Sequence, residues 1–286
     1  MLPIYYINLA SRQDRREFME RQLAALGLAA SRIEAVTADE IEPADADRYC
    51  NPAYPSFLRK RELACTLSHE RAWRAMLEGG HAAGLFLEDD AVLSPLLPSF
   101  LQEASAIDAD LIRIEKSNRI RVYPARGTGV SGIAVREFRS TPMGAAGYVL
   151  KASAVRRLLG HSGLRTQPVD VALYNPFDDP GASLTRVITE PALCRQLGTH
   201  DPKAAAGRSD LAHDRVRHTF AEDHPARFTL MKLERSVSRG VRNVLDHFAQ
   251  LPRGLERRAI RFEDGVHHAS PLAAAQPVVA AVTSSP

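Results

Sequence analysis

Short runs of bulky apolar residues alternate with amphipathic segments through the first 160 residues, a pattern typical of α/β proteins. Each run is too short for a helix and predicts a buried strand; the runs cover residues 3–9, 33–36, 83–87, 111–114 and 147–150. Apolar residues three or four positions apart predict helices between them, over residues 14–26, 62–77 and 154–159. We therefore predict an α/β fold in which helices flank a sheet.

The rest of the chain has a weaker pattern. Residues 39–61 contain three prolines and predict a polar loop, and residues 117–143 predict a hairpin or strands around 130–138. A basic stretch over residues 227–262 predicts a long helix that is broken near Pro252. We expect an α/β domain over residues 1–200, a basic, mainly helical extension over 201–264 and a disordered tail over 265–286.

Composition narrows the class of protein. The chain has 286 residues, of which 45% are apolar and 25% charged, as in ordinary globular proteins. A net charge of +3 is too small to predict nucleic-acid binding, and no apolar stretch is long enough to span a bilayer. Met1 leads directly into a predicted strand, so we expect no N-terminal signal. Three cysteines without metal-ligand spacing (Cys50, Cys65 and Cys194) fit a reducing cytoplasm.

Three consecutive acids, Glu88, Asp89 and Asp90, follow the predicted strand over 83–87. In open α/β sheets, ligands bind just beyond the carboxyl ends of the strands. Carboxylates gathered there repel one another and are costly to bury, so a divalent cation is a natural partner. Mg²⁺ and Mn²⁺ are commonly held by one or two carboxylates and by substrate phosphates. The triplet predicts such a site, with a solvated acidic turn as the alternative.

The order and spacing of several motifs resemble glycosyltransferase family 25, which includes bacterial lipooligosaccharide β-galactosyltransferases and, more distantly, collagen galactosyltransferases. The motifs are I-N-L-x-x-R-x-D-R from Ile7, R-I-E-A-V from Arg32, E-L-A-C-T-L-S-H-x-x-x-W from Glu62 and L-F-L-E-D-D from Leu85. Later matches include Pro168-Val169-Asp170, and the resemblance covers residues 2–200. It implies a GT-A-type, Rossmann-like mixed sheet for the catalytic domain.

The resemblance also implies roles for individual residues. The acidic triplet takes the place of the D-x-D-type motif, with Asp89 and Asp90 on Mn²⁺ or Mg²⁺ and Glu88 nearer the ribose or base of the donor. The expected donor site also contains Asn8, Arg12 and Arg15 at the end of the first strand, together with Ser68 and His69. The alternative for Arg12 and Arg15 is that they form solvated ion pairs at the start of a helix. The alternative for His69, which lies on an apolar stripe, is a core histidine that orients the acidic loop.

The inverting chemistry implied by the resemblance needs a base for the acceptor hydroxyl, and a positioned carboxylate suits that task. Asp170 in the Pro168-Val169-Asp170 match is the expected base. Asp178 and Asp179 are rivals on a proline-flanked loop that also reads as a turn. His200 could complete the metal shell, with a surface histidine as its alternative.

Taken together, these features predict an inverting glycosyltransferase that moves galactose from a UDP-sugar to an oligosaccharide or lipid-linked glycan. A metal-dependent phosphoesterase and a catalytically silent glycan-binding protein remain as alternatives. The C-terminal stretch over 227–262 carries nine basic and three acidic residues beside an apolar face. It predicts peripheral contact with the anionic inner face of the cytoplasmic membrane, or else a helix packed on the domain.

Overall fold

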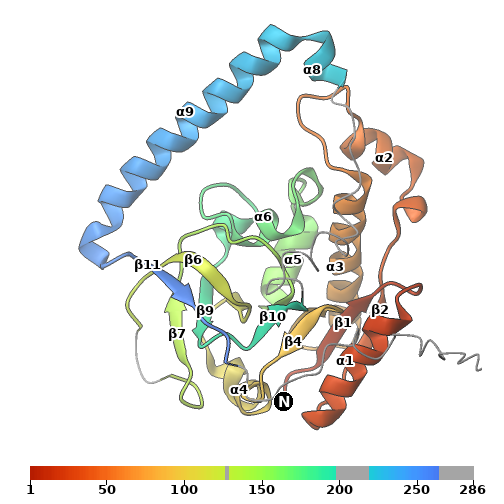
Figure 1. The fold of residues 1–286 in the computed structure, drawn as a ribbon, viewed down its shortest axis with the longest axis vertical. Helices are drawn as coiled ribbons and strands as arrows, with labels where there is room; N and C mark the ends of the chain where they lie inside the picture. The colour runs from red at the N-terminus through yellow and green to blue at the C-terminus, as the bar shows by residue number, and fades with distance from the viewer. Residues whose placement is uncertain (126–128, 198–218, 264–286) are drawn as a thin grey trace, which may run out of the picture.

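A seven-stranded mixed sheet forms the centre of the computed structural model, which describes residues 1–125, 129–197 and 219–263 (Figure 1). Its strand order is β2-β1-β3-β8-β5-β9-β7. The strands are β1 (Ile4–Asn8), β2 (Ser31–Glu34), β3 (Ala83–Glu88), β5 (Leu111–Arg113), β7 (Ala134–Glu137), β8 (Gly147–Lys151) and β9 (Arg186–Glu190). Because β8 is antiparallel to both β3 and β5, these two strands point the same way and end at the same edge of the sheet.

Helices cover both faces of this sheet. The helices are α1 (Gln13–Ala25), α2 (Pro43–Cys50), α3 (Lys60–Glu78), α4 (Leu97–Glu103), α5 (Ala152–Gly160) and α6 (Val169–Tyr174). Alternation along β1 divides the core: Ile4 and Tyr6 pack with Met19 of α1, whereas Tyr5 and Ile7 pack with Trp73 of α3. Both sets are buried, which confirms the predicted fold class of a GT-A-type mixed sheet flanked by helices.

Two small sheets and several 3₁₀ turns accompany the central sheet in the described residues. Strand β10 (Cys194–Gln196) pairs with β4 (Ala91–Leu93), and β11 (Glu256–Ile260) pairs with β6 (Ser117–Val122). The 3₁₀ turns are Ala38–Glu40, Ala104–Ala106, Leu164–Thr166, Gly181–Ser183 and Leu251–Arg253.

Two sequence-based boundaries differ from the structure. The segment 39–61 is not a continuous loop, because Pro43 starts α2 at a position where its fixed φ suits a helix, and Tyr49 packs against the small core around Leu58 and Leu63. Strand β2 ends at Glu34 rather than at Val36. The Val36 N–H bonds to the Ser68 hydroxyl at 2.8 Å instead of extending the ladder.

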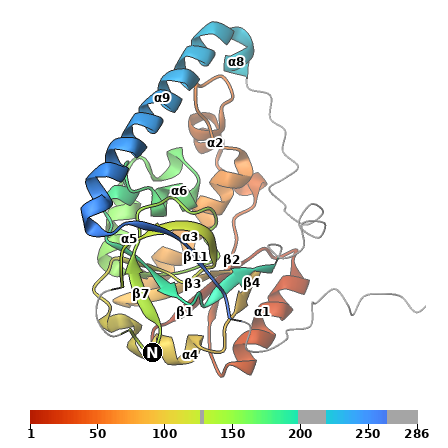
Figure 2. The same ribbon diagram turned by 60° about the vertical axis from the view of Figure 1, so that its left-hand side comes forward.

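The C-terminal extension begins with α8 (Thr219–Asp223) and the long helix α9 (Pro225–Gln250), which runs along one side of the domain (Figures 1 and 2). The helix ends close to Pro252, as predicted. Beyond it the chain is a strand rather than a helix, because Gly254 turns it at φ +72° and β11 then pairs with β6. No helix of the described ranges is long and apolar enough to cross a membrane. The predicted tail over 265–286 lies outside the described residues.

Candidate active site

Carboxylates from three parts of the chain gather at the edge where β3 and β5 end. Glu88 is the last residue of β3 and Glu115 lies two residues beyond β5. Asp170, in the first turn of α6, accepts a hydrogen bond from the Gly144 N–H at 2.9 Å. A Cβ on Gly144 would lie 3.0 Å from Glu115 Oε1, so Gly144 brings the Glu115 and Asp170 side chains to one place.

Glycine makes this convergence possible at two positions. Gly144 has φ +84°, a conformation that side chains rarely adopt, and its carbonyl accepts from Arg113 at 2.6 Å. Gly147 starts β8, and a Cβ there would collide with the Cys194 Sγ. The absence of that side chain lets β10 approach the first residue of β8. The loop between the two glycines therefore holds the acidic edge together.

Burial makes the charged forms of these acids unfavourable. It raises the pKa of Glu88, and the negative charges of Asp89 and Asp170 raise that pKa further. The positive charges of Arg15 and Arg113 lower it in part. Burial and Glu88 likewise raise the pKa of Asp90. Burial also raises the pKa of Glu115 to about 7, although its ion pair with Arg113 at 3.0 Å lowers it. Such a group of acids gains stability from a proton or a cation.

Asp90 offers an oxygen for a cation. Its Oδ1 is buried and has no hydrogen-bond partner within residues 1–125, 129–197 and 219–263. An unpaired buried carboxylate oxygen costs free energy, and a hard divalent ion would remove that cost. Glu88 and Glu115 act on Asp90 electrostatically, but among the described residues these three acids do not bring their oxygens within 4.8 Å of one another. The fit to Mg²⁺ or Mn²⁺ therefore rests on the Asp90 oxygen, with substrate phosphates to supply further ligands.

A second donor set lies beside the acids: ligand atoms of Cys65, His69 and Glu88 fall within 4.8 Å of one another. Thiolate sulfur and imidazole nitrogen suit softer ions than Mg²⁺. Burial raises the pKa of the Cys65 thiol well above its usual value, with Glu88 and Asp170 adding to the rise. Without a metal Cys65 is therefore a neutral thiol, and a hard cation such as Mg²⁺ would prefer the carboxylate oxygens to its sulfur.

Asp89 has protein partners on both oxygens. Asn8 Nδ2 donates to Oδ2 at 2.9 Å, and Arg15 donates to Oδ1 at 3.0 Å. The structure thus brings Asn8 and Arg15 to the acidic triplet. Arg12 instead forms an ion pair with Asp14 at 2.8 Å, and its carbonyl accepts from Asn8 Nδ2.

A chain of buried hydrogen bonds ends at Glu88. Trp73 Nε1 donates to the Tyr148 hydroxyl at 3.0 Å, and that hydroxyl lies 2.6 Å from His69 Nδ1. The hydroxyl keeps an acceptor for its own proton when His69 Nδ1 is unprotonated, and we assign that tautomer. The His69 proton is then on Nε2, which lies 3.4 Å from Glu88 Oε1. Burial lowers the pKa of His69 to about 4, so the ring is neutral at pH 7. His69 thus occupies the position of a core histidine oriented toward the acidic edge.

The remaining candidates have different surroundings. Ser68 is buried, and its hydroxyl bonds the Val36 N–H and the Ala64 carbonyl. Asp178 is exposed; burial raises its pKa, but hydrogen bonds from Arg242 and Asn175 lower it overall. Asp179 is also exposed. His200 lies outside the described residues. Asp170 is therefore the one of the three aspartates placed at the acidic edge.

Sequence reasoning missed Glu115, Arg113 and Tyr148. The signal for Glu115 was present, because it follows a predicted strand just as the triplet does. Its neighbour Arg113 is fully buried and lies over the Tyr174 ring at 4.7 Å. Tyr148 reads from sequence only as a strand residue, and the hydroxyl that joins Trp73 to His69 becomes apparent only when β8 lies beside β3.

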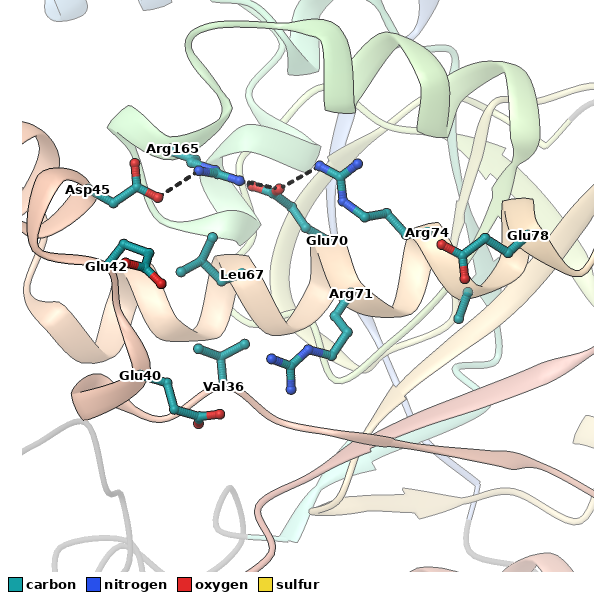
Figure 3. A pocket seen from close by; sticks show the side chains of 11 residues that line it. Val36, Glu40, Glu42, Asp45, Leu67, Glu70, Arg71, Arg74, Glu78 and Arg165 are labelled. Atoms are coloured by element: carbon teal, nitrogen blue, oxygen red, sulfur yellow. Dashed lines mark hydrogen bonds and ion pairs between the residues drawn. The ribbon is translucent and has the colours of Figure 1, made fainter.

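A surface hollow of about 410 Å³ lies on another side of α3 (Figure 3). Arg165 joins Asp45 at 2.9 Å and Glu70 at 2.7 Å, and Glu70 also pairs with Arg74. None of the lining residues belongs to the acidic edge. The ion pairs satisfy these charges, so the acidic edge and not this hollow is the candidate active site.

Comparison with known proteins agrees with this geometry. Residues 1–173 match the family model described as glycosyltransferase family 25 (LPS biosynthesis protein). The chain is 27% identical over 255 residues to the lacto-N-neotetraose biosynthesis glycosyltransferase LgtB of Neisseria gonorrhoeae, covering 82% of this chain and 90% of that one.

Two animal relatives match a shorter part. Procollagen galactosyltransferase 1-B of Xenopus laevis is 27% identical over 191 residues, and the inactive glycosyltransferase 25 family member 3 of Homo sapiens is 29% identical over 190. Each alignment covers 61% of this chain and 31% of the relative. Since the family model covers more than half of the chain, the protein belongs to glycosyltransferase family 25.

Proposed function

We propose that the protein is an inverting, metal-dependent glycosyltransferase that moves galactose from UDP-galactose to a hydroxyl of a lipooligosaccharide or related surface glycan. The observation that carries the proposal is the acidic edge, with an unpartnered Asp90 oxygen, in a chain of this family. The family description supports a surface-glycan acceptor, and the name of the Xenopus relative supports galactose.

Asp90 is the proposed direct ligand of Mn²⁺ or Mg²⁺, with Glu88 and Asp89 beside it. When bound, such a cation stabilises the negative charge that develops on the departing nucleoside diphosphate. Asp89 holds Asn8 and Arg15 next to this position. An arginine there suits recognition of a donor phosphate. The protein partners on both oxygens of Asp89 favour Asp90 over Asp89 as the direct ligand.

Asp170 is the proposed base. The acceptor oxygen attacks the anomeric carbon of the donor, the bond from that carbon to the diphosphate oxygen breaks, and the hydroxyl proton passes to the Asp170 carboxylate. Attack from the side opposite the leaving group inverts the anomeric configuration. The Gly144 N–H fixes the Asp170 carboxylate at the acidic edge, which supports this role.

The proposed site of action is the cytoplasm. The three cysteines, Cys50, Cys65 and Cys194, are free thiols, as expected in a reducing compartment. A lipid-linked acceptor would place the reaction at the inner face of the cytoplasmic membrane, and the predicted membrane contact of the extension stays a prediction.

Asp90→Ala tests the function. Transfer from UDP-galactose should fall to background, and UDP binding measured by calorimetry should lose its dependence on Mn²⁺, while the far-UV circular dichroism stays unchanged. The matched control Asp178→Ala, at an exposed ion pair, should keep both properties. Normal turnover in Asp90→Ala, or full wild-type activity in excess chelator, would contradict the proposal. Turnover by the wild type would also distinguish this protein from a catalytically silent glycan-binding protein.

A further inference from the structure

Helix α9 carries an apolar stripe that faces away from the domain. Its side chains are between 48% and 65% exposed: Leu230, Leu233, Val237, Val241, Val244, Leu245, Phe248 and the following Leu251. At about 100° per residue these positions fall within about 120° of the helix circumference. A soluble helix normally turns such a stripe toward its own core.

The polar side of α9 faces the domain instead. Arg242 pairs with Asp178 at 2.8 Å, and Asp246 is buried between Arg139 and Arg121. The Tyr123 hydroxyl donates to Gln250 at 2.7 Å. These contacts fix the rotation of the helix, so the stripe faces away from them, in agreement with its exposure. Figures 1 and 2 show the course of α9 beside the domain.

Without Leu245, which would lie against Ser236, and with Gly240 added, the spacing of the stripe is the same when it is read in either direction. Positions 230, 233, 237, 240, 241, 244, 248 and 251 are separated by 3, 4, 3, 1, 3, 4 and 3 residues. An antiparallel second copy crossing between Gly240 and Val241 would therefore set Leu230 against Leu251, Leu233 against Phe248 and Val237 against Val244. A two-fold axis requires such self-complementarity.

Gly240 gives an independent reason for this crossing point. A glycine in an exposed helix costs about 1 kcal/mol relative to alanine. A Cβ on Gly240 would meet no atom of the described residues within 4 Å, so packing within this chain does not require the glycine. At the centre of a helix pair it would let two backbones approach closely, as small residues do where helices cross.

We propose that two copies of this chain form an antiparallel dimer through α9, with the two-fold axis between Gly240 and Val241. The self-complementary spacing and Gly240 favour a second copy over an anionic membrane, because a membrane surface requires neither. Arg235, Arg239 and Arg242 project from the side of the helix opposite the stripe. In the dimer these like charges are kept apart.

Val237→Glu tests the contact, with Arg235→Glu as the matched control on the opposite side of the helix. Light scattering coupled to size exclusion, run at several concentrations, should give a dimer for the wild type and for Arg235→Glu and a monomer for Val237→Glu. Circular dichroism checks that each variant is folded. A wild type that stays monomeric at every concentration, or a Val237→Glu variant that still dimerises, would overturn the proposal.

Cysteine cross-linking tests the direction and register. Val241→Cys should form a disulfide-linked dimer by itself, whereas Leu233→Cys alone should not, because its two copies would lie about 22 Å apart along the axis. A mixture of Leu233→Cys and Phe248→Cys should cross-link, with the wild type as control for the native cysteines. Self-linking of Leu233→Cys would overturn the antiparallel arrangement.

The same variants separate a membrane partner from a second copy. Sedimentation with phosphatidylglycerol vesicles should give equal binding for the wild type and Val237→Glu. If the wild type is monomeric and its vesicle binding is lost in Val237→Glu, the stripe is a membrane contact and the dimer proposal is overturned.

Discussion

Removing the Tyr148 hydroxyl should lower the free energy of unfolding by more than the loss of one hydrogen bond would. It is fully buried, it accepts from Trp73 Nε1 and it donates to His69 Nδ1. Tyr148→Phe removes both bonds and leaves the indole N–H and an imidazole nitrogen in a dry environment. The ring stays in place, so the change isolates the hydroxyl.

The expected loss of unfolding free energy follows from these two groups. Leaving one buried polar group without its partner costs about 1–3 kcal/mol. Trp73 Nε1–H and His69 Nδ1 face the same vacated position as donor and acceptor, so a small shift of the two rings can relieve part of the cost. We therefore expect Tyr148→Phe to lower the free energy of unfolding by about 2–4 kcal/mol, a large fraction of the stability of an ordinary domain.

Tyr174→Phe is the matched control. Tyr174 is also fully buried, but its hydroxyl has no hydrogen bond of good geometry within the described part of the chain; its polar neighbour Arg113 lies over the ring. Its removal should cost less than about 1 kcal/mol. Urea unfolding followed by circular dichroism measures both variants. Equal losses for the two, or no loss for Tyr148→Phe, would refute the hydrogen-bond chain.

Three further predictions concern the acidic edge. Asp170→Asn should lower transfer about 100-fold or more while UDP binding persists, and Asp178→Asn should stay active; parallel loss of binding and turnover would exclude the base role. Metal-free protein should lose about 3 kcal/mol of unfolding free energy through Glu115 as the pH rises from about 4.5 to about 7, because the folded state raises the pKa of Glu115 from 4.5 to about 7 and so favours its protonated form; in urea unfolding over this pH range, Glu115→Gln should lose correspondingly less than the wild type. Gly144→Ala should destabilise more in urea than Gly132→Ala, since both have positive φ but only a Cβ at Gly144 meets neighbouring atoms; equal losses would refute this.

Most of the central sheet could be predicted from local pattern. The apolar runs that become β1, β3 and β8 are short and dense, and burial on both faces of a sheet demands such residues. The acidic triplet was predictable for the same reason, because a strand end fixes its position. The helix α3 also follows from its apolar stripe, which contains Trp73 and Met76.

Contacts between distant segments could not be predicted in this way. Asp89 was assigned to a metal from its place in the triplet, but Asn8 and Arg15 reach its oxygens from the neighbouring strand and helix. Sequence reasoning found the apolar face of α9 but left open whether it packs on the domain, since an amphipathic pattern does not say which side faces the domain. That direction depends on Asp246 and Arg242 and their partners.

The central claim is tested most directly by incubating the protein with a panel of UDP-sugars, simple acceptor glycosides and Mn²⁺, with products read by mass spectrometry. The account predicts an acceptor one hexose heavier with UDP-galactose, and no such product in excess chelator or with Asp90→Ala. An intact donor across the whole panel, hydrolysis without transfer, or equal product in the presence of chelator would contradict it.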